Sequence, residues 1–238
     1  MYIFDEFDEA EGKNKFWTEP IEKVNEEIRE KQKNDRIARS GVTLVVGCPL
    51  PPEIQEKILA VQTTFDRILV DYRIPACVKW REVLFALHMT VYGLSKPDDY
   101  KRGKSWQGAA EILGQVDMPL PLDFHLSLQG LGILGAGAIA VRISDSKELN
   151  LIRDRIEKVP SVSKRAYGEK LNQIIIGRFL PDLKGIDRNI IKKCVLGDLR
   201  DFLFGEITVN SFELVHYKHE FLNQVYCQKV FPWTSRGN

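Results

Sequence analysis

The sequence predicts an α+β or mixed α/β protein, built as two lobes of similar make-up behind a helical arm. Three observations lead to this expectation. The chain has 238 residues, of which 44% are hydrophobic and 28% are charged, enough for one large domain or two small lobes. Short β-branched or alternating runs follow amphipathic helical segments along most of the sequence. Some of the predicted strands are joined directly by turn residues, which indicates hairpins and antiparallel pairing.

Residues 1–40 differ from the rest of the chain and are predicted to form the arm. They contain eleven acidic and eight basic residues and few large apolar ones. Thr18-Glu19-Pro20 is a typical helix start, with a capping hydroxyl and an early proline. Only Ile21, Val24 and Ile28 then supply a thin apolar stripe. We expect either a solvated helix docked on the body or on a protein partner, or a mobile arm.

The body, residues 41–238, opens with a β-branched run at Val42–Val46 that predicts a buried strand. The prolines at 49–52 end this strand and begin a helix, in which apolar residues from Ile54 to Ile68 recur at helical spacing. Periodicity predicts the later elements in this order: a strand at 84–94, a helix at 106–116, strands at 124–131 and 138–143, a helix at 147–159, a strand at 171–179, a helix at 187–204, and strands at 207–217 and 224–231.

Composition excludes several classes of protein. The formal net charge is +1, so no broad basic field indicates a large nucleic-acid partner. The first twelve residues hold five acids and no base, unlike a signal peptide, and no apolar stretch approaches the length of about 18 residues that spans a membrane. We therefore expect a soluble, cytoplasmic protein without a membrane partner.

The cysteines and histidines do not form a metal-binding pattern. Cys48, Cys77, Cys194 and Cys227 are far apart in the sequence, which predicts reduced thiols rather than a zinc site or a disulfide framework. The histidines of His216-Tyr-Lys-His219 would face opposite sides of a strand and could not converge on an ion. No metal and no cofactor is expected.

A glycine-rich segment, Gly130-Leu-Gly132-Ile-Leu-Gly135, matches the dinucleotide-binding pattern GxGxxG. That function requires a helix to begin within the pattern, so that its N-terminal amides meet a pyrophosphate. The residues that follow, Ala-Gly-Ala-Ile-Ala-Val-Arg-Ile, favour a strand instead. We interpret the segment as a hairpin connection.

The first candidate site lies in the run Phe85–Tyr92. Strand alternation places His88, Thr90 and Tyr92 on one face, opposite an apolar face that includes Met89. A hydroxyl can hold a phosphate oxygen there while the neighbouring imidazole transfers a proton near neutral pH. A structural histidine would give the same short pattern.

A similar pattern occurs in the predicted strand that begins at Phe124. Its apolar residues should face the core, which leaves His125, Ser127 and Gln129 on the opposite face. The loop at 98–104, with Trp106, carries cations and rings that could meet a nucleotide, although its acids are also typical of a solvated loop.

Four segments together resemble the 2H phosphoesterase superfamily, which includes 2′-5′ RNA ligase-like proteins and cyclic nucleotide phosphodiesterases. They are GVTLVVGCPLPP, LHMTVYGL, DFHLSLQGLG and IIIGRF, and the resemblance extends over residues 41–231. It implies two pseudo-symmetric lobes with antiparallel-rich sheets around a central groove. Each lobe of such proteins contributes one HxT or HxS strand. One histidine is the general base and the other the general acid on a cyclic or 2′-5′ phosphodiester, without a metal.

The resemblance assigns the first motif to His88 and Thr90, but the second motif is degenerate. Alignment on Gly177-Arg178-Phe179 places Gln173 where the superfamily has histidine, and Ile175 where it has a hydroxyl. Glutamine can hydrogen-bond a phosphate but cannot transfer a proton near pH 7.

The resemblance therefore leaves two hypotheses. In the first, the protein acts on or binds a cyclic or 2′-5′-linked nucleotide or RNA end, with His125 supplying the missing imidazole and with Tyr92, Ser127 and Gln173 contacting the ligand. In the second, it is a catalytically inactive binding protein for a nucleotide, RNA or a protein.

Overall fold

The computed structural model describes residues 13–35, 40–47, 49–81, 87–94, 105–116, 123–135, 137–160, 162, 172–218 and 228–233. The helical elements are α2 (Lys15–Thr18), α3 (Ile21–Asp35), α4 (Pro52–Asp71), α6 (Ser105–Gly114), α7 (Lys147–Glu157), α8 (Gly185–Lys193) and the π-helical turn η2 (Cys194–Asp198). The strands are β1 (Ser40–Val46), β2 (Val78–Trp80), β3 (Met89–Gly93), β4 (Phe124–Leu134), β5 (Ala138–Ile143), β6 (Gln173–Phe179), β7 (Leu203–Val209), β8 (Phe212–Lys218) and β9 (Gln228–Trp233).

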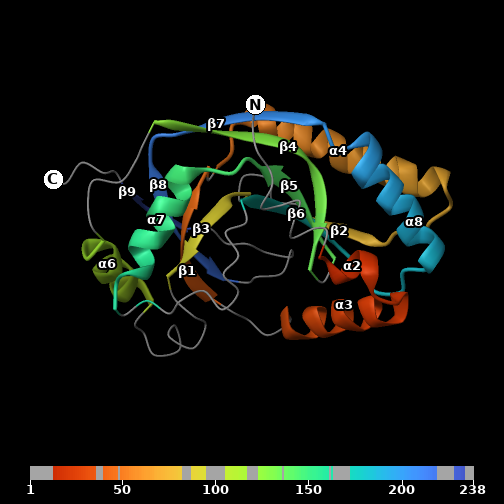
Figure 1. Ribbon diagram of the computed structural model, residues 1–238, viewed down its shortest axis with the longest axis horizontal. Coiled ribbons are helices and arrows are strands. Elements are labelled where there is room, and N and C mark those ends of the chain that lie inside the picture. Colours follow the sequence, from red (N-terminus) through yellow and green to blue (C-terminus); the bar gives the residue numbers. More distant parts are fainter. Residues whose placement is uncertain are drawn as a thin grey trace.

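The described strands form two antiparallel sheets. Sheet A has the order β3-β1-β8-β9, and sheet B has the order β2-β6-β5-β4-β7. The two sheets approach each other where β3 of sheet A contacts β6 of sheet B, near the middle of Figure 1. The strand that carries the first sequence motif therefore lies beside the strand that carries the degenerate second one.

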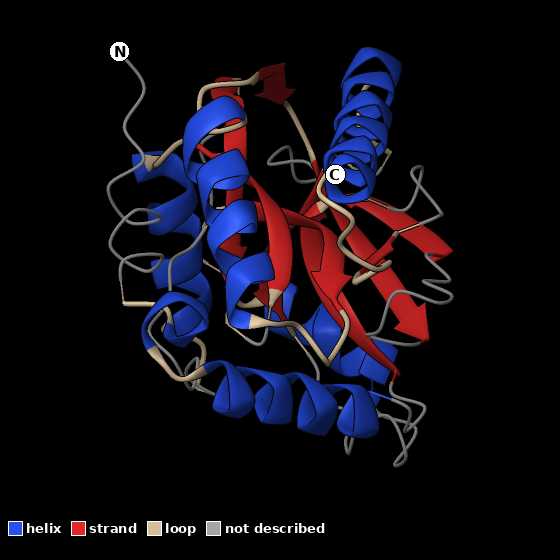
Figure 2. Ribbon diagram, turned by 90° about the vertical axis from the view of Figure 1, so that its right-hand side faces the viewer, coloured by secondary structure: helices blue, strands red, loops and turns tan. Residues whose placement is uncertain are grey.

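Each sheet is covered by helices on one side, so that helices lie on the outside of the molecule and strands between them (Figure 2). On sheet B, α4 contacts β7, and its Gln62 donates a hydrogen bond to the Ile176 carbonyl. On sheet A, α6 contacts β1 and α7 contacts β3. The predicted α+β fold class, with two antiparallel sheets and flanking helices, is confirmed. No described helix has the length and hydropathy needed to cross a bilayer.

The glycine-rich segment forms a hairpin, as predicted. β4 pairs with β5 from Leu128↔Ile143 to Leu134↔Ala138, and no helix begins at Gly132. Gly137, in the connection, has a φ of 71°, a left-handed conformation that glycine adopts without strain. The dinucleotide-binding interpretation is therefore excluded by the local backbone.

The two helices of the N-terminal arm dock on one end of sheet B rather than projecting into solvent. Phe16 is 2% exposed and stacks on Phe179 of β6, with ring centroids 5.1 Å apart. Val24 and Ile28 belong to the same apolar core as the sheets. Asn25 reinforces the contact, because its amide donates to one backbone carbonyl and its oxygen accepts from two backbone amides before α8. Residues 13–35 are therefore part of the packed body.

The structure differs from the predicted elements in three places. Residues 207–217 form two strands instead of one: β7 pairs with β4 in sheet B, and β8 pairs with β1 in sheet A. The chain crosses between the sheets within Asn210-Ser211, which local alternation does not reveal. The helix predicted at 187–204 ends early, because the Leu199 and Phe202 carbonyls accept hydrogen bonds from β4 amides instead of continuing a helix. The short strand β2 was missed.

Candidate functional site

The first motif lies at the start of β3, the edge strand of sheet A: His88 directly precedes the strand and Thr90 is its second residue. Met89 and Val91 are buried against the helices, whereas Thr90 is exposed and His88 is half-buried. Thr90 stands opposite Val45 in the register of β1 and β3. The predicted separation of a buried apolar face from an accessible His88–Thr90 pair is therefore present.

Tyr92 does not share that face, contrary to the predicted alternation. A β-bulge at this point pairs Leu44 with Tyr92 but Val45 with Thr90, so Val91 is an extra residue on β3. Since directly opposite residues point to the same side of a sheet, Tyr92 lies with Leu44 in the apolar core, and it is 2% exposed. Its backbone carbonyl accepts a hydrogen bond from the Thr43 hydroxyl. A buried ring in this place is not available to a ligand.

The degenerate second motif begins β6, with Gln173 and Ile175 on the face opposite Ile174 and Ile176 of the main core. Gln173 stands directly opposite Arg142 of β5. Its side-chain oxygen, Oε1, is buried and has no hydrogen-bond partner among the described residues. Ile175, two positions along, packs on a small apolar cluster of Leu134, Ala138 and Ala140, separate from the main core. The position that would hold the second hydroxyl is therefore apolar.

Arg142 was not singled out from the sequence. Its side chain is 4% exposed, and its Nη1 atom donates to the Arg200 carbonyl at 3.4 Å. Gly130 makes room for both groups: a Cβ there would lie 3.2 Å from Nη1 and 1.9 Å from the carbonyl oxygen. Gly130 also has a φ of 74°, in a bulge of β4. Strand alternation could have found Arg142, since it follows Ala138 and Ala140 on one face of an otherwise apolar strand.

His125 and Ser127 occupy the predicted face of β4, but in different environments. His125 is exposed, and its Nδ1 atom shares a hydrogen bond of 3.2 Å with the Thr208 hydroxyl of β7, its cross-strand partner. Ser127 is 1% exposed, and its hydroxyl has no partner among the described residues. Gln173 lies two strands away and about four residues along, so its Cα is roughly 16 Å from that of His125 by ideal sheet spacing. The structure does not bring His125 beside the second motif.

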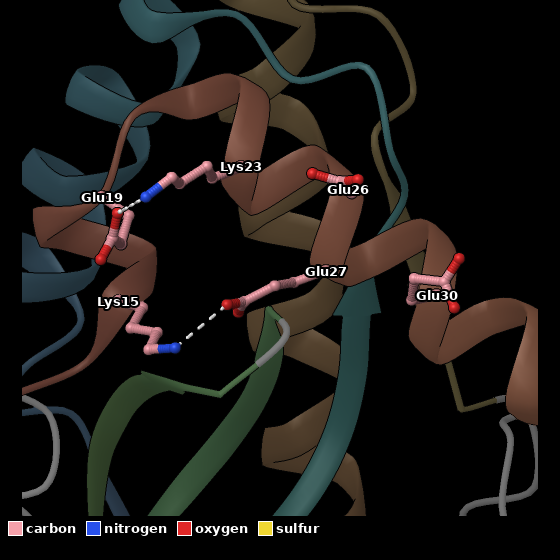
Figure 3. A pocket seen from close by; sticks show the side chains of 6 residues that line it. All are labelled: Lys15, Glu19, Lys23, Glu26, Glu27 and Glu30. Carbon is pink, nitrogen blue, oxygen red and sulfur yellow. Dashed lines mark hydrogen bonds and ion pairs between the residues drawn. The ribbon is translucent and has the colours of Figure 1, made fainter.

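An accessible hollow elsewhere involves only the two N-terminal helices (Figure 3). It measures about 420 Å³ and is lined by Lys15, Glu19, Lys23, Glu26, Glu27 and Glu30. Lys15 pairs with Glu27 at 3.4 Å and Lys23 with Glu19 at 3.2 Å. The side chains that line this hollow are those of a charged helix surface, and none of them belongs to the candidate site.

The described residues contain no group of three or more histidine, cysteine or acidic side chains placed to bind a metal. Cys77 and Cys194 are free and buried, and Cys48 and Cys227 lie outside the described residues. Burial raises the pKa of each to about 11, with further contributions from Asp187 at Cys77 and Asp198 at Cys194. Both thiols are therefore protonated and unreactive near neutral pH. The loop at 98–104, the Trp106 side chain and His219 lie outside the described residues.

The two antiparallel sheets with their flanking helices form a fold that this chain shares with several solved structures. The chain is similar to TT0787 of Thermus thermophilus, with a TM-score of 0.53 and 16% identity over 82% of this chain and 98% of that one. It is also similar to E. coli LigT, solved in complex with NADP+, with a TM-score of 0.54 and 15% identity over 83% of this chain and 98% of that one. At sequence identities this low, the similarity to these two structures shows a shared fold and no more. No protein-family model and no curated protein matches the sequence.

Proposed function

We propose that this protein binds a cyclic or 2′-5′-linked nucleotide or an RNA end where β3 and β6 meet, with His88 and Thr90 as its first phosphate contacts. The observation that carries the proposal is the placement of this accessible pair at the start of β3, which contacts β6, the strand of the degenerate second motif. The similarity in fold to LigT, solved with the nucleotide NADP+, supports a nucleotide ligand.

The chemistry of the residues favours binding over rapid turnover. The Thr90 hydroxyl can donate to a non-bridging phosphate oxygen, and the His88 imidazole can donate to or accept a proton from a second oxygen. Gln173 can hydrogen-bond the ligand but cannot transfer its proton. Because one proton-transfer group contributes about 10²–10⁴-fold to the rate, we expect hydrolysis to be weak or absent.

His125 is the alternative source of a second imidazole. Its hydrogen bond to Thr208 and its separation from Gln173, roughly 16 Å by ideal sheet spacing, argue against that role. We therefore propose that His125 does not take part in binding or in any residual turnover.

The test is a panel of 2′,3′-cyclic nucleotides and 2′-5′ oligonucleotides, assayed for binding by calorimetry and for turnover by chromatography, with EDTA present throughout. The proposal expects binding by the wild-type protein, its loss in His88→Ala, and no change in the matched control His125→Ala. Thermal melts should show that both variants are folded. Binding that survives in His88→Ala, or no binding to any member of the panel, would overturn the proposal. Turnover abolished by His125→Ala would instead establish the two-imidazole enzyme.

A further inference from the structure

A buried arginine lies on the inner face of α7, the helix that packs against β3 (Figure 1). Arg153 is 1% exposed, and the other buried residues of this helix are apolar: Leu149, Ile152 and Ile156. An arginine is rarely placed in such surroundings unless its donors are used. Its Nε atom donates to the Val91 carbonyl of β3 at 3.2 Å, and its Nη1 atom donates to the Asn150 side chain at 3.4 Å. Arg153 therefore joins the helix to the edge strand of sheet A.

The carbonyl that accepts the Nε hydrogen bond belongs to the β-bulge of β3. Val91 is the extra residue there, between Thr90 and Tyr92. The extra residue of a bulge is left out of the regular pairing between strands, so its backbone groups depend on other partners. The next carbonyl, that of Tyr92, accepts from the Thr43 hydroxyl at 3.0 Å. Two consecutive carbonyls at the bulge thus accept from side chains, one of α7 and one of β1.

The bulge determines which side chains of β3 reach the accessible face. In a regular strand Thr90 and Tyr92 would share one face, because they are two residues apart. The bulge separates them, so that Thr90 is exposed whereas Tyr92 is buried in the core. Regular pairing would either turn Tyr92 out beside Thr90 or turn Thr90 into the core. Either change would alter the surface that meets a ligand.

We propose that Arg153 and Thr43 are positioning residues, which hold the bulge of β3 and thereby direct Thr90 toward the ligand while Tyr92 stays in the core. In this role neither side chain contacts the ligand. Arg153 acts through the carbonyl of Val91, the residue next to Thr90, and Thr43 acts through the Tyr92 carbonyl. The effect on binding rests on the proposed function, whereas the effect on the register of β3 can be measured without a ligand.

NMR reads this register directly in the ligand-free protein. The bulge places Thr90 opposite Val45, and it also places Tyr92 opposite Leu44. Opposite residues of an antiparallel pair have Cα atoms about 4.5–5.5 Å apart, close enough for cross-strand nuclear Overhauser effects. Regular pairing cannot contain both pairs, because they are two residues apart on β3 but one residue apart on β1. The two cross-strand contacts together are therefore a signature of the bulge.

Two substitutions at position 153 differ in whether they keep the donor. Arg153→Met places a methyl group where Nε lies, Arg153→Gln places an amide nitrogen there, and both remove the charge. We expect the methionine variant to lose one of the two cross-strand contacts. It should also bind the 2′,3′-cyclic nucleotide that the wild-type protein prefers about 10–100-fold more weakly, the usual effect of losing one hydrogen bond to a charged group. The glutamine variant should keep both contacts and bind nearly as the wild type does.

A matched control separates positioning from stability. Ile156→Ala removes buried apolar volume from the same face of α7, so it should destabilise the fold without removing a donor at the bulge. It should keep both cross-strand contacts and the wild-type affinity. If melting shows that Arg153→Met is unfolded, Thr43→Val decides the question, since it removes the second donor and hardly changes the shape of the side chain. It should lose one contact and bind the cyclic nucleotide several-fold more weakly.

The outcomes separate this inference from the proposed function. The positioning role is wrong, and the proposed function stands, if the deciding variant is folded and keeps either both contacts or the wild-type affinity. The same conclusion follows if the methionine and glutamine variants behave alike. If the contacts change as expected but the wild-type protein binds no member of the panel, the proposed function fails, and the role of Arg153 in holding the strand stands.

Discussion

Rebuilding the second motif, by combining Gln173→His with Ile175→Thr, should convert a binding protein into a measurable phosphodiesterase. The backbone of β6 already places Gln173 directly opposite Arg142 of β5, on a strand that contacts β3. A second imidazole there would supply the missing proton-transfer group, worth about 10²–10⁴-fold. We therefore expect kcat for a 2′,3′-cyclic nucleotide to rise by about 100-fold or more.

The structure also allows the stability of this double variant to be worked out. Gln173 Oε1 has no partner among the described residues, so no described hydrogen bond through that atom is lost. Ile175 is half-buried against Leu134, Ala138 and Ala140, and shortening it to threonine should cost roughly 1–2 kcal/mol. A domain stable by about 5–15 kcal/mol tolerates that loss.

Chromatographic product analysis at pH 6–8, with KM and kcat separated, measures the gain. Ile175→Thr alone is the control and should remain as slow as the wild type. If the double variant is folded and binds the cyclic ester but shows no gain, the Gln173 side chain does not face the scissile phosphate and the assignment of the second motif is refuted.

Three further predictions concern packing and thiol chemistry. Phe16→Ala should reduce the free energy of unfolding in urea by about 3–5 kcal/mol, because the ring is buried against the sheet; a loss below about 1 kcal/mol would mean that the arm is not part of the core. Gly130→Ala should destabilise by more than about 3 kcal/mol, through overlap with a backbone carbonyl and its positive φ, whereas Gly108→Ala in α6, with open space around it, should be neutral or stabilising. Cys77 and Cys194 should resist a thiol reagent at pH 8 and react in urea, as resolved by peptide mass spectrometry; rapid labelling of the folded protein would contradict their burial. Folding raises the pKa of both thiols from the ordinary 9.0 to about 11. Between about pH 9 and 11 the unfolded state therefore loses these protons more readily than the folded state, and the free energy of unfolding should fall as the pH increases.

Where the fold depends on local patterns, the sequence was sufficient to predict it. The β4–β5 hairpin follows from apolar alternation on either side of a glycine-rich turn, and its strands pair with each other. The accessible positions of His88 and Thr90 follow from the same alternation. Both features depend only on residues close together in the chain.

The errors occur where distant residues decide the structure. Tyr92 is buried because β1 imposes a bulge on β3, and a bulge reverses the alternation on which the prediction depended. The division of 207–217 into β7 and β8 depends on partners in β4 and β1. The environment of Arg142 similarly depends on Gly130 and on the Arg200 carbonyl from another part of the chain. Periodicity alone contains none of this information.

The repeated crossing of the chain between the two sheets has a consequence for how the protein folds during synthesis. β1 is synthesised early, but β8, with which it pairs, is synthesised near the end of the chain. β4 likewise cannot pair with β7 until the later part of the chain has been synthesised. Neither sheet can be completed from one half of the chain, so the two lobes are not independently folding units. Such non-local pairing is typical of slow folding and leaves strand edges exposed meanwhile. A fragment ending before β7 should therefore aggregate or be degraded, rather than persist as a folded single lobe.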